Sequence, residues 1–193
     1  MHRSGKLRKD HNMKKNIVAV LLVIALSTAA AFAATNPPNS SFDVKTNVSG
    51  INKMKLTTAA FPANGNPAAF DSAAAFTGPL VVSASGTQTF SAYLSTMSNN
   101  RKGYKVSMTV TAMASEVSGQ ATSYINYTVQ VNGVSIETNG ATALAEQTVI
   151  DQPAMPGLSS QSHKISLIVD STTFDEAVEG DYEGTVTFIY AAK

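Results

Sequence analysis

Apolar and polar side chains alternate along three runs in the second half of the chain. The runs are 104–112, 125–131 and 182–190, and Thr, Ser, Lys, Asn, Gln or Glu fill most of the positions between the apolar ones. A period of two is expected of a β-strand with one face on a core and the other in water. The side chains that we expect in this core are Val106, Met108, Val110, Tyr127, Val129, Val186 and Phe188.

Shorter apolar runs predict further strands at 42–48, 54–56, 80–82, 90–94, 148–150 and 165–169. Asn132-Gly133 predicts a two-residue hairpin, because a type I′ turn needs positive φ at both of its central positions. The polar stretch 99–103 predicts a longer turn. The Ala-rich stretches 59–75 and 140–147 stay open between loop and short helix. The sequence therefore predicts an all-β fold, an antiparallel immunoglobulin-like β-sandwich of about eight or nine strands.

The first 33 residues have the pattern of a secretory signal peptide. Lys14 and Lys15 precede an unbroken apolar run at 17–26, and Ala31-Phe32-Ala33 fits the small-residue cleavage pattern. We predict cleavage after Ala33, which leaves one β-sandwich domain at 34–193. The expected location is outside the cytoplasm: the periplasm, the cell surface or the medium.

Two alternatives stay open for this leader. A membrane anchor is the first, although the apolar run is only about half of the ~20 residues that span a bilayer. The second concerns the start of translation, because Met13 opens a more typical leader than Met1 does, and 1–12 is then an upstream extension. After cleavage no membrane span is expected.

Removing the leader changes the charge of the chain. It takes six of the 14 Lys and Arg residues and one of the 13 Asp and Glu residues, which leaves 8 against 12 and a net charge of −4. No basic stripe remains, so nucleic acid is not an expected partner. The chain has no Cys, so the fold must be stabilised by its core without disulfides.

Groups suited to catalysis are scarce after the leader. His163 is the one histidine there, no Cys is available as a nucleophile, and Gly-x-Ser-x-Gly is absent. We therefore expect neither an enzyme nor a cofactor, and a zinc site lacks the several His or Cys ligands it needs. The acidic run 175–183 has two interpretations, a calcium site or a solvated turn, and it lacks the spacing of a calcium-binding loop.

Three segments together resemble the β-sandwich subunits of bacterial fimbriae that assemble by the chaperone–usher route. The first is the alternating segment 42–48 behind the leader, and the second is the polar turn and strand at 99–106. The third is the terminal strand 180–190, in which Gly180 is fourteenth from the end. Tyr190 is fourth from the end, where such subunits usually have a penultimate tyrosine.

The resemblance implies a partner and an interface. In such fimbriae a subunit donates an N-terminal strand to its neighbour's incomplete sandwich. Here the donated residues would be Phe42, Val44 and Val48, and the receiving strand would offer Val186, Phe188 and Tyr190. The partners would be other copies or other fimbrial subunits and a periplasmic chaperone. The alternative is that 42–48 is the first strand of a complete sandwich.

Two functions therefore remain open. The first is a non-enzymatic structural or adhesive surface protein, such as a fimbrial subunit. The second is a secreted or periplasmic module that binds a glycan or small ligand. An enzyme is more distant, because the residues it usually needs are missing.

Overall fold

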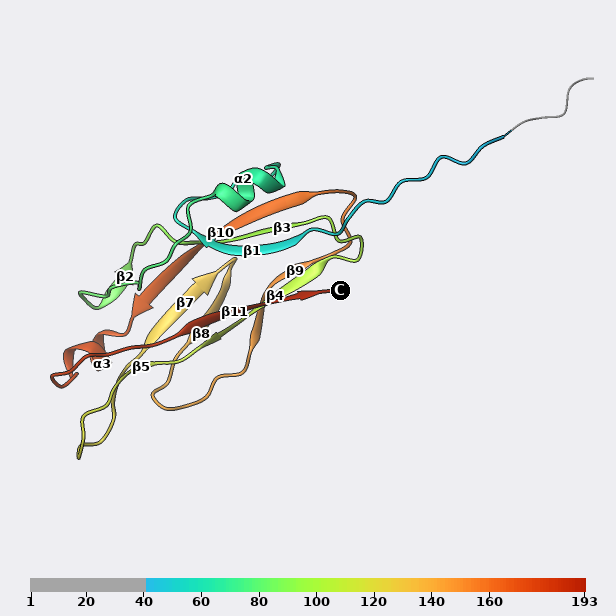
Figure 1. The fold of residues 1–193 in the computed structure, drawn as a ribbon. Helices are drawn as coiled ribbons and strands as arrows, with labels where there is room; N and C mark the ends of the chain where they lie inside the picture. The colour runs from blue at the N-terminus through green and yellow to red at the C-terminus, as the bar shows by residue number, and fades with distance from the viewer. Residues whose placement is uncertain (1–40) are drawn as a thin grey trace, which may run out of the picture. The chain divides into compact units, whose positions relative to one another are not determined.

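The structure is a computed structural model that describes residues 41–193 (Figure 1). The predicted signal peptide and its cleavage site lie outside the described residues. The chain divides into two units, 1–47 and 48–193. In the first unit, residues 41–47 carry neither strand nor helix, and their side chains are exposed. No helix within 41–193 is long and apolar enough to cross a membrane.

Unit 48–193 is built from antiparallel sheets, which confirms the all-β class. The largest sheet has the order β1-β3-β10-β7-β8, with β2 also paired to β10, and the second has the order β11-β4-β9. Within the described residues there are eleven strands instead of eight or nine. The first sheet contains β1 (Asn52–Thr57), β2 (Gly86–Gln88), β3 (Tyr93–Ser98), β7 (Tyr127–Val131), β8 (Val134–Glu137) and β10 (Ser159–Val169). The second contains β4 (Tyr104–Val110), β9 (Gln147–Gln152) and β11 (Val186–Ala192).

Three small elements complete the unit. Strands β5 (Met113–Ser115) and β6 (Ser123–Ile125) pair with each other. Helix α2 (Pro67–Ser72) lies in the first of the two Ala-rich stretches, where the Asn66 side chain accepts a hydrogen bond from the Ala69 N–H at 2.8 Å and caps the helix. Helix α3 (Ser171–Asp175) has no counterpart in the predictions. The second Ala-rich stretch, 140–147, contains no helix.

The core lies between the two larger sheets and contains most of the predicted side chains. Val106, Met108 and Val110 of β4 are buried, as are Tyr127 and Val129 of β7. They belong to one cluster with residues of β3, β9 and β10. Two predicted core residues on β11, Val186 and Phe188, are only half-buried, and both line the candidate site described below.

The predicted turns form as expected. Asn132 and Gly133 have φ of 52° and 76°, and they join β7 to β8 at the pair Val131 and Val134. Gly103 ends the second turn with φ of 86°. A Cβ at this position would lie 2.1 Å from the carbonyl oxygen of Gln152, so the turn requires glycine both for its backbone and for its space.

Several predicted strands differ from the structure: the one predicted at 90–94 is β3, which begins only at Tyr93, and the run 182–190 becomes a strand only from Val186. The segment 42–48 forms no strand, and the first strand is β1. The segment 80–82 also forms none, although Leu80 and Val82 are half-buried against the core. Strand β10 begins at Ser159 instead of 165, because its first half pairs with β3 and its second half with β7. A polar, serine-rich sequence thus becomes a strand through its neighbours.

Candidate functional site

Strand β11 has one unpaired main-chain edge. It pairs with β4 alone among the strands of the described residues. The Thr111 N–H donates to the Thr185 carbonyl at 3.0 Å, and the Lys193 N–H donates to the Gly103 carbonyl at 3.1 Å. Residues that hydrogen-bond to a partner strand alternate along an antiparallel pair. The main-chain groups of odd-numbered residues therefore face β4, and those of Val186, Phe188 and Tyr190 face the open edge.

The side chains of the same three residues are incompletely covered. Val186, Phe188 and Tyr190 are each half-buried. Their partners on β4 are Val110, Met108 and Val106, whose side chains are 3%, 0% and 0% exposed. Both strands turn alternate side chains inward, so the difference comes from their places in the sheet. β4 is central, whereas β11 lies at an edge with no strand beyond it.

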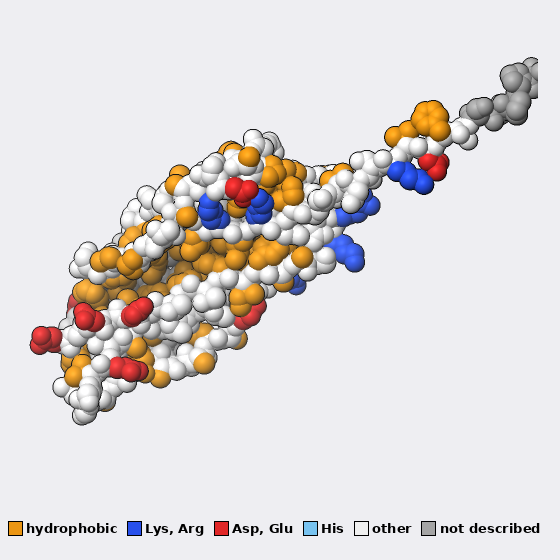
Figure 2. Space-filling view, viewed as in Figure 1, with side chains coloured by type: hydrophobic (Ala, Val, Ile, Leu, Met, Phe, Trp, Pro, Cys, Tyr) orange, Lys and Arg blue, Asp and Glu red, His pale blue; other side chains and the backbone are white. Residues whose placement is uncertain are grey.

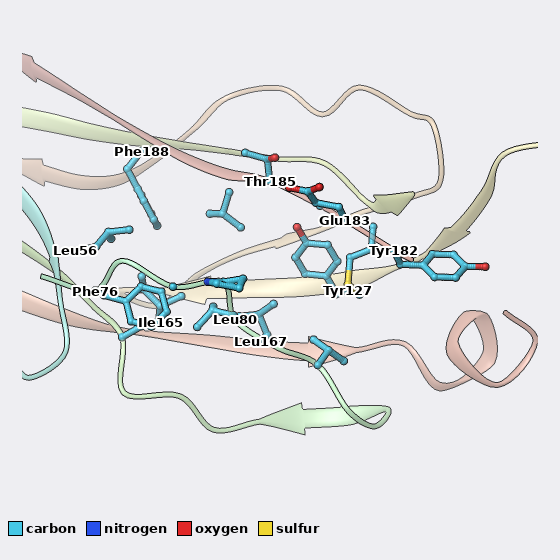
Figure 3. Close-up of a pocket in the computed structure, with 17 residues that line it drawn as sticks. Leu56, Phe76, Leu80, Tyr127, Ile165, Leu167, Tyr182, Glu183, Thr185 and Phe188 are labelled. Carbon is cyan, nitrogen blue, oxygen red and sulfur yellow. The ribbon is translucent and has the colours of Figure 1, made fainter. Parts of the chain in front are cut away.

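An apolar groove of about 350 Å³ runs beside this edge. In the space-filling view, apolar side chains are visible in a long hollow between the two sheets (Figure 2). Its walls come from both layers (Figure 3), with Leu56 from β1, Ile165 and Leu167 from β10, and Val186 and Phe188 from β11. The strandless segment 76–82 supplies a further part of the lining, Phe76, Pro79, Leu80 and Val82.

The polar groups in the groove are few and mostly bonded already. The Tyr127 hydroxyl donates to the Thr111 carbonyl at 2.8 Å. Burial raises the pKa of Tyr127 to about 12, so this hydroxyl stays protonated at neutral pH. The Tyr182 hydroxyl lies 2.9 Å from the Val178 carbonyl oxygen. Glu183 is the one charged lining residue. The groove is suited to apolar side chains and offers no arrangement of acid, base and nucleophile.

Side chains bridge β11 to β1 beyond one end of the groove. The Tyr190 hydroxyl donates to Asn52 Oδ1 at 2.9 Å, and its ring stacks on Tyr104 at 4.9 Å between centroids. Burial, above all, raises the pKa of Tyr190. Of the three residues predicted for the receiving strand, Val186 and Phe188 line the groove, whereas Tyr190 lies beyond this end of it. The opposite end, at Glu183, has no such bridge between β1 and β11 in the described residues.

The side chains of the three predicted donor residues are exposed in the structure. Phe42, Val44 and Val48 are 88%, 86% and 77% exposed. Val48 lies against a shallow hollow lined also by Asn99, Asn100 and Arg101. Because 42–48 forms no strand, the prediction that it is the first strand of a complete sandwich is not met by this structure.

The other candidate groups occupy different surroundings. His163 lies on β10, half-buried, with Nε2 3.1 Å from Gln161 Oε1. Burial lowers the pKa of this imidazole. Within 41–193, no group of three or more His, Cys, Asp or Glu side chains is placed to hold a metal ion, and this includes the acidic run 175–183.

The comparisons with known proteins add no identification. No family model matches the chain, and no curated protein matches its sequence.

The groove itself was not predicted, since it depends on Phe76, Leu80, Ile165 and Leu167 meeting from distant segments. Its one sequence signal was the terminal alternating strand that supplies Val186 and Phe188.

Proposed function

We propose that this chain is an exported, non-enzymatic surface protein whose copies assemble through the groove beside β11. The N-terminal segment of one copy, with Phe42, Val44 and Val48, fills the groove of another and pairs with the free edge of β11. One observation carries the proposal: an unpaired strand edge lies over an apolar groove in a chain that leaves an alternating apolar segment unburied.

The chemistry of the two surfaces is complementary. An added strand forms main-chain hydrogen bonds with a free sheet edge, and alternate side chains fill the pockets beneath it. Burying an exposed Phe or Val side chain contributes roughly 1.5–3 kcal/mol before the cost of ordering the segment. Phe42 and Val44 are two residues apart, as are Val186 and Phe188. Once the N-terminal segment is extended, its apolar side chains would therefore have the same spacing along the groove as those of β11.

A polypeptide segment suits this groove better than a glycan does. The hydroxyls of Tyr127 and Tyr182 already have protein partners, so few polar groups remain free to bind sugar hydroxyls. The free main-chain groups of β11, in contrast, match another strand. A secreted or periplasmic module that binds a glycan or small ligand is therefore the second candidate function, and the experiment below distinguishes it from assembly.

The size distribution of the exported protein tests the proposal. We expect a chain beginning at Ala34, by mass spectrometry, that forms a ladder of oligomers in analytical ultracentrifugation. Val44→Asp should abolish the ladder because it places a charge in the apolar groove, whereas Asn47→Asp adds the same charge at an alternate position and should not. Removing residues 34–48 should likewise leave a monomer.

Two results would contradict the proposal. An intact protein that stays monomeric at every concentration would leave the secreted binding module as the function. Equal loss of assembly in both substituted proteins would show that the alternating apolar face does not determine binding.

A further inference from the structure

One segment of the groove lining is held by its side chains alone. Residues 77–83, which we call the strap, form no main-chain hydrogen bond with any other described residue. The strap is anchored just before its first residue, where the Phe76 N–H donates to the Leu56 carbonyl at 2.9 Å. Beyond its last residue, the chain is held again where β2 pairs with β10. Between these two anchors only side-chain packing keeps the strap in place.

The side chains of the strap have the arrangement of an inserted strand. Leu80 and Val82 are half-buried and pack against the core, whereas Val81 between them is 72% exposed. Figure 3 shows Leu80 on the same side of the groove as Leu167, opposite Thr185. The predicted strand at 80–82 thus has the inward and outward alternation of a strand, but no partner strand in the described residues.

The chain has room to move near both ends of the strap. A Cβ added at Gly78 or Gly86 would have no heavy atom of another segment within 4 Å, so other segments do not confine the chain there. Pro79 has no N–H, which makes the strap a poor partner for permanent strand pairing. Segments without main-chain hydrogen bonds and with few buried contacts open locally at a low free-energy cost.

We propose that the strap is a displaceable plug, which occupies part of the groove in the unassembled protein and swings outward when an extended segment enters. This inference rests on the proposed function and adds an autoinhibitory contact to it. An entering segment places alternate apolar side chains as Leu80 and Val82 do, and it also pairs with the free edge of β11, with which the strap forms no bonds. The entering segment therefore has the advantage over the strap.

The plug has a consequence for affinity. A protein whose open form is only a fraction of the molecules binds with an apparent affinity reduced by that fraction. The strap also covers apolar surface that would otherwise be exposed before assembly, when exposed apolar patches promote aggregation. If the strap were instead a fixed wall of the groove, Leu80 and Val82 would contribute to binding, and their loss would weaken it.

The sign of the change in affinity separates the plug from a fixed wall. We consider the Val44→Asp chain, which is expected to be monomeric, and a peptide of residues 35–50 with the native sequence. Adding Leu80→Ser together with Val82→Ser should tighten peptide binding about tenfold in isothermal titration calorimetry, because the open form becomes more populated. Val81→Ser makes a similar change at the exposed position and should leave the Kd within about twofold. Weaker or unchanged binding in the double variant would overturn the plug.

Spin labels test the movement with Leu80 and Val82 in place, which avoids any loss of folding in the double variant. The chain has no cysteine of its own, so labels can be placed at Val81→Cys and Gln130→Cys, both at exposed positions. In double electron–electron resonance, a saturating amount of the peptide should shift the distance between these labels. The pair Thr87→Cys and Gln130→Cys should not shift, because β2 stays paired with β10. An unchanged distance at Val81 with the peptide bound would overturn the plug and leave the groove proposal intact.

A neutral apolar dye separates failure of the plug from failure of the proposed function. If the unaltered protein neither forms oligomers nor binds the peptide, the proposed function is refuted. Nile red tests the plug in either case, because the dye needs only an accessible apolar groove. The double variant with Leu80→Ser and Val82→Ser should bind more Nile red than the Val81→Ser control, and equal or lower binding would overturn the plug.

Discussion

The open edge of β11 makes a residue-by-residue prediction for amide hydrogen exchange. We consider the Val44→Asp chain, which is expected to be monomeric, and add a peptide of residues 35–50 with the native sequence. The amides of Val186, Phe188 and Tyr190 face the open edge, whereas those of Thr187 and Ile189 face β4. Binding should therefore protect every second amide along the strand.

The size of the protection follows from the occupancy of the groove. At a peptide concentration 100 times its Kd, binding stabilises the bound form by about 2.7 kcal/mol. This corresponds to a slowing of about 100-fold for the amides that the peptide covers, and tenfold more peptide should add nearly another factor of ten. The amides of Thr187 and Ile189 are already paired with β4, so the largest relative change falls on the even-numbered residues.

Exchange followed by two-dimensional NMR resolves these amides individually. A peptide carrying Val44→Asp provides the control, because it keeps the length and main chain but places a charge in the apolar groove. Protection confined to odd-numbered residues would show that the assigned hydrogen-bond phase of β11 is wrong. Equal protection by both peptides, or protection elsewhere with none on β11, would refute the use of the groove as a strand-binding site.

Three further predictions concern the fold itself. Val129→Asp should cost several kcal/mol and unfold the domain, because the side chain is fully buried, whereas Gln130→Asp on the exposed face should change the urea midpoint little. Gly184→Ala should destabilise the protein by about 1–3 kcal/mol in the same assay, since its Cβ would lie 2.9 Å from the Thr111 carbonyl oxygen. Burial lowers the pKa of His163, so the unfolded state binds a proton more readily than the folded state, and the stability of the protein should fall as pH drops below about 6.5. The His163→Gln protein should lose less stability over this range. Parallel pH profiles of stability for the two proteins would contradict this explanation.

The fold class was predictable because alternation reports one-sided burial directly. Strands β4 and β7 follow their sequence pattern residue by residue, and the Asn132-Gly133 turn adopts the expected backbone. Strands β2, β5 and β6 were missed because each has only three residues, too few to establish an alternating pattern, and β2 in addition pairs only with the distant strand β10. The first half of β10 was missed for a related reason: its serine-rich sequence is held by β3, and sequence pattern alone carries no record of that neighbour.

The structure also changes the choice of control for the core substitution. Alternation alone predicts that Thr128 is an exposed neighbour of Val129. It is half-buried, however, and pairs directly with Glu137 on β8. An Asp at this position would face a like charge across the strands, which is destabilising in itself. Gln130 lies opposite Ser135 and avoids this repulsion.

The two largest differences between prediction and structure complement each other. Phe42 and Val44 are expected on a strand face and are almost fully exposed, while Val186 and Phe188 are expected in the core and are only half-buried. Alternation indicates that one face of a strand is buried but not which molecule buries it, so the proposed partner copy would satisfy the same pattern. A self-contained sandwich does not explain why one chain leaves both its N-terminal apolar segment exposed and the apolar face of β11 incompletely buried. The proposed assembly through the groove would account for both, because the side chains left uncovered on β11 would be covered by those left exposed before β1.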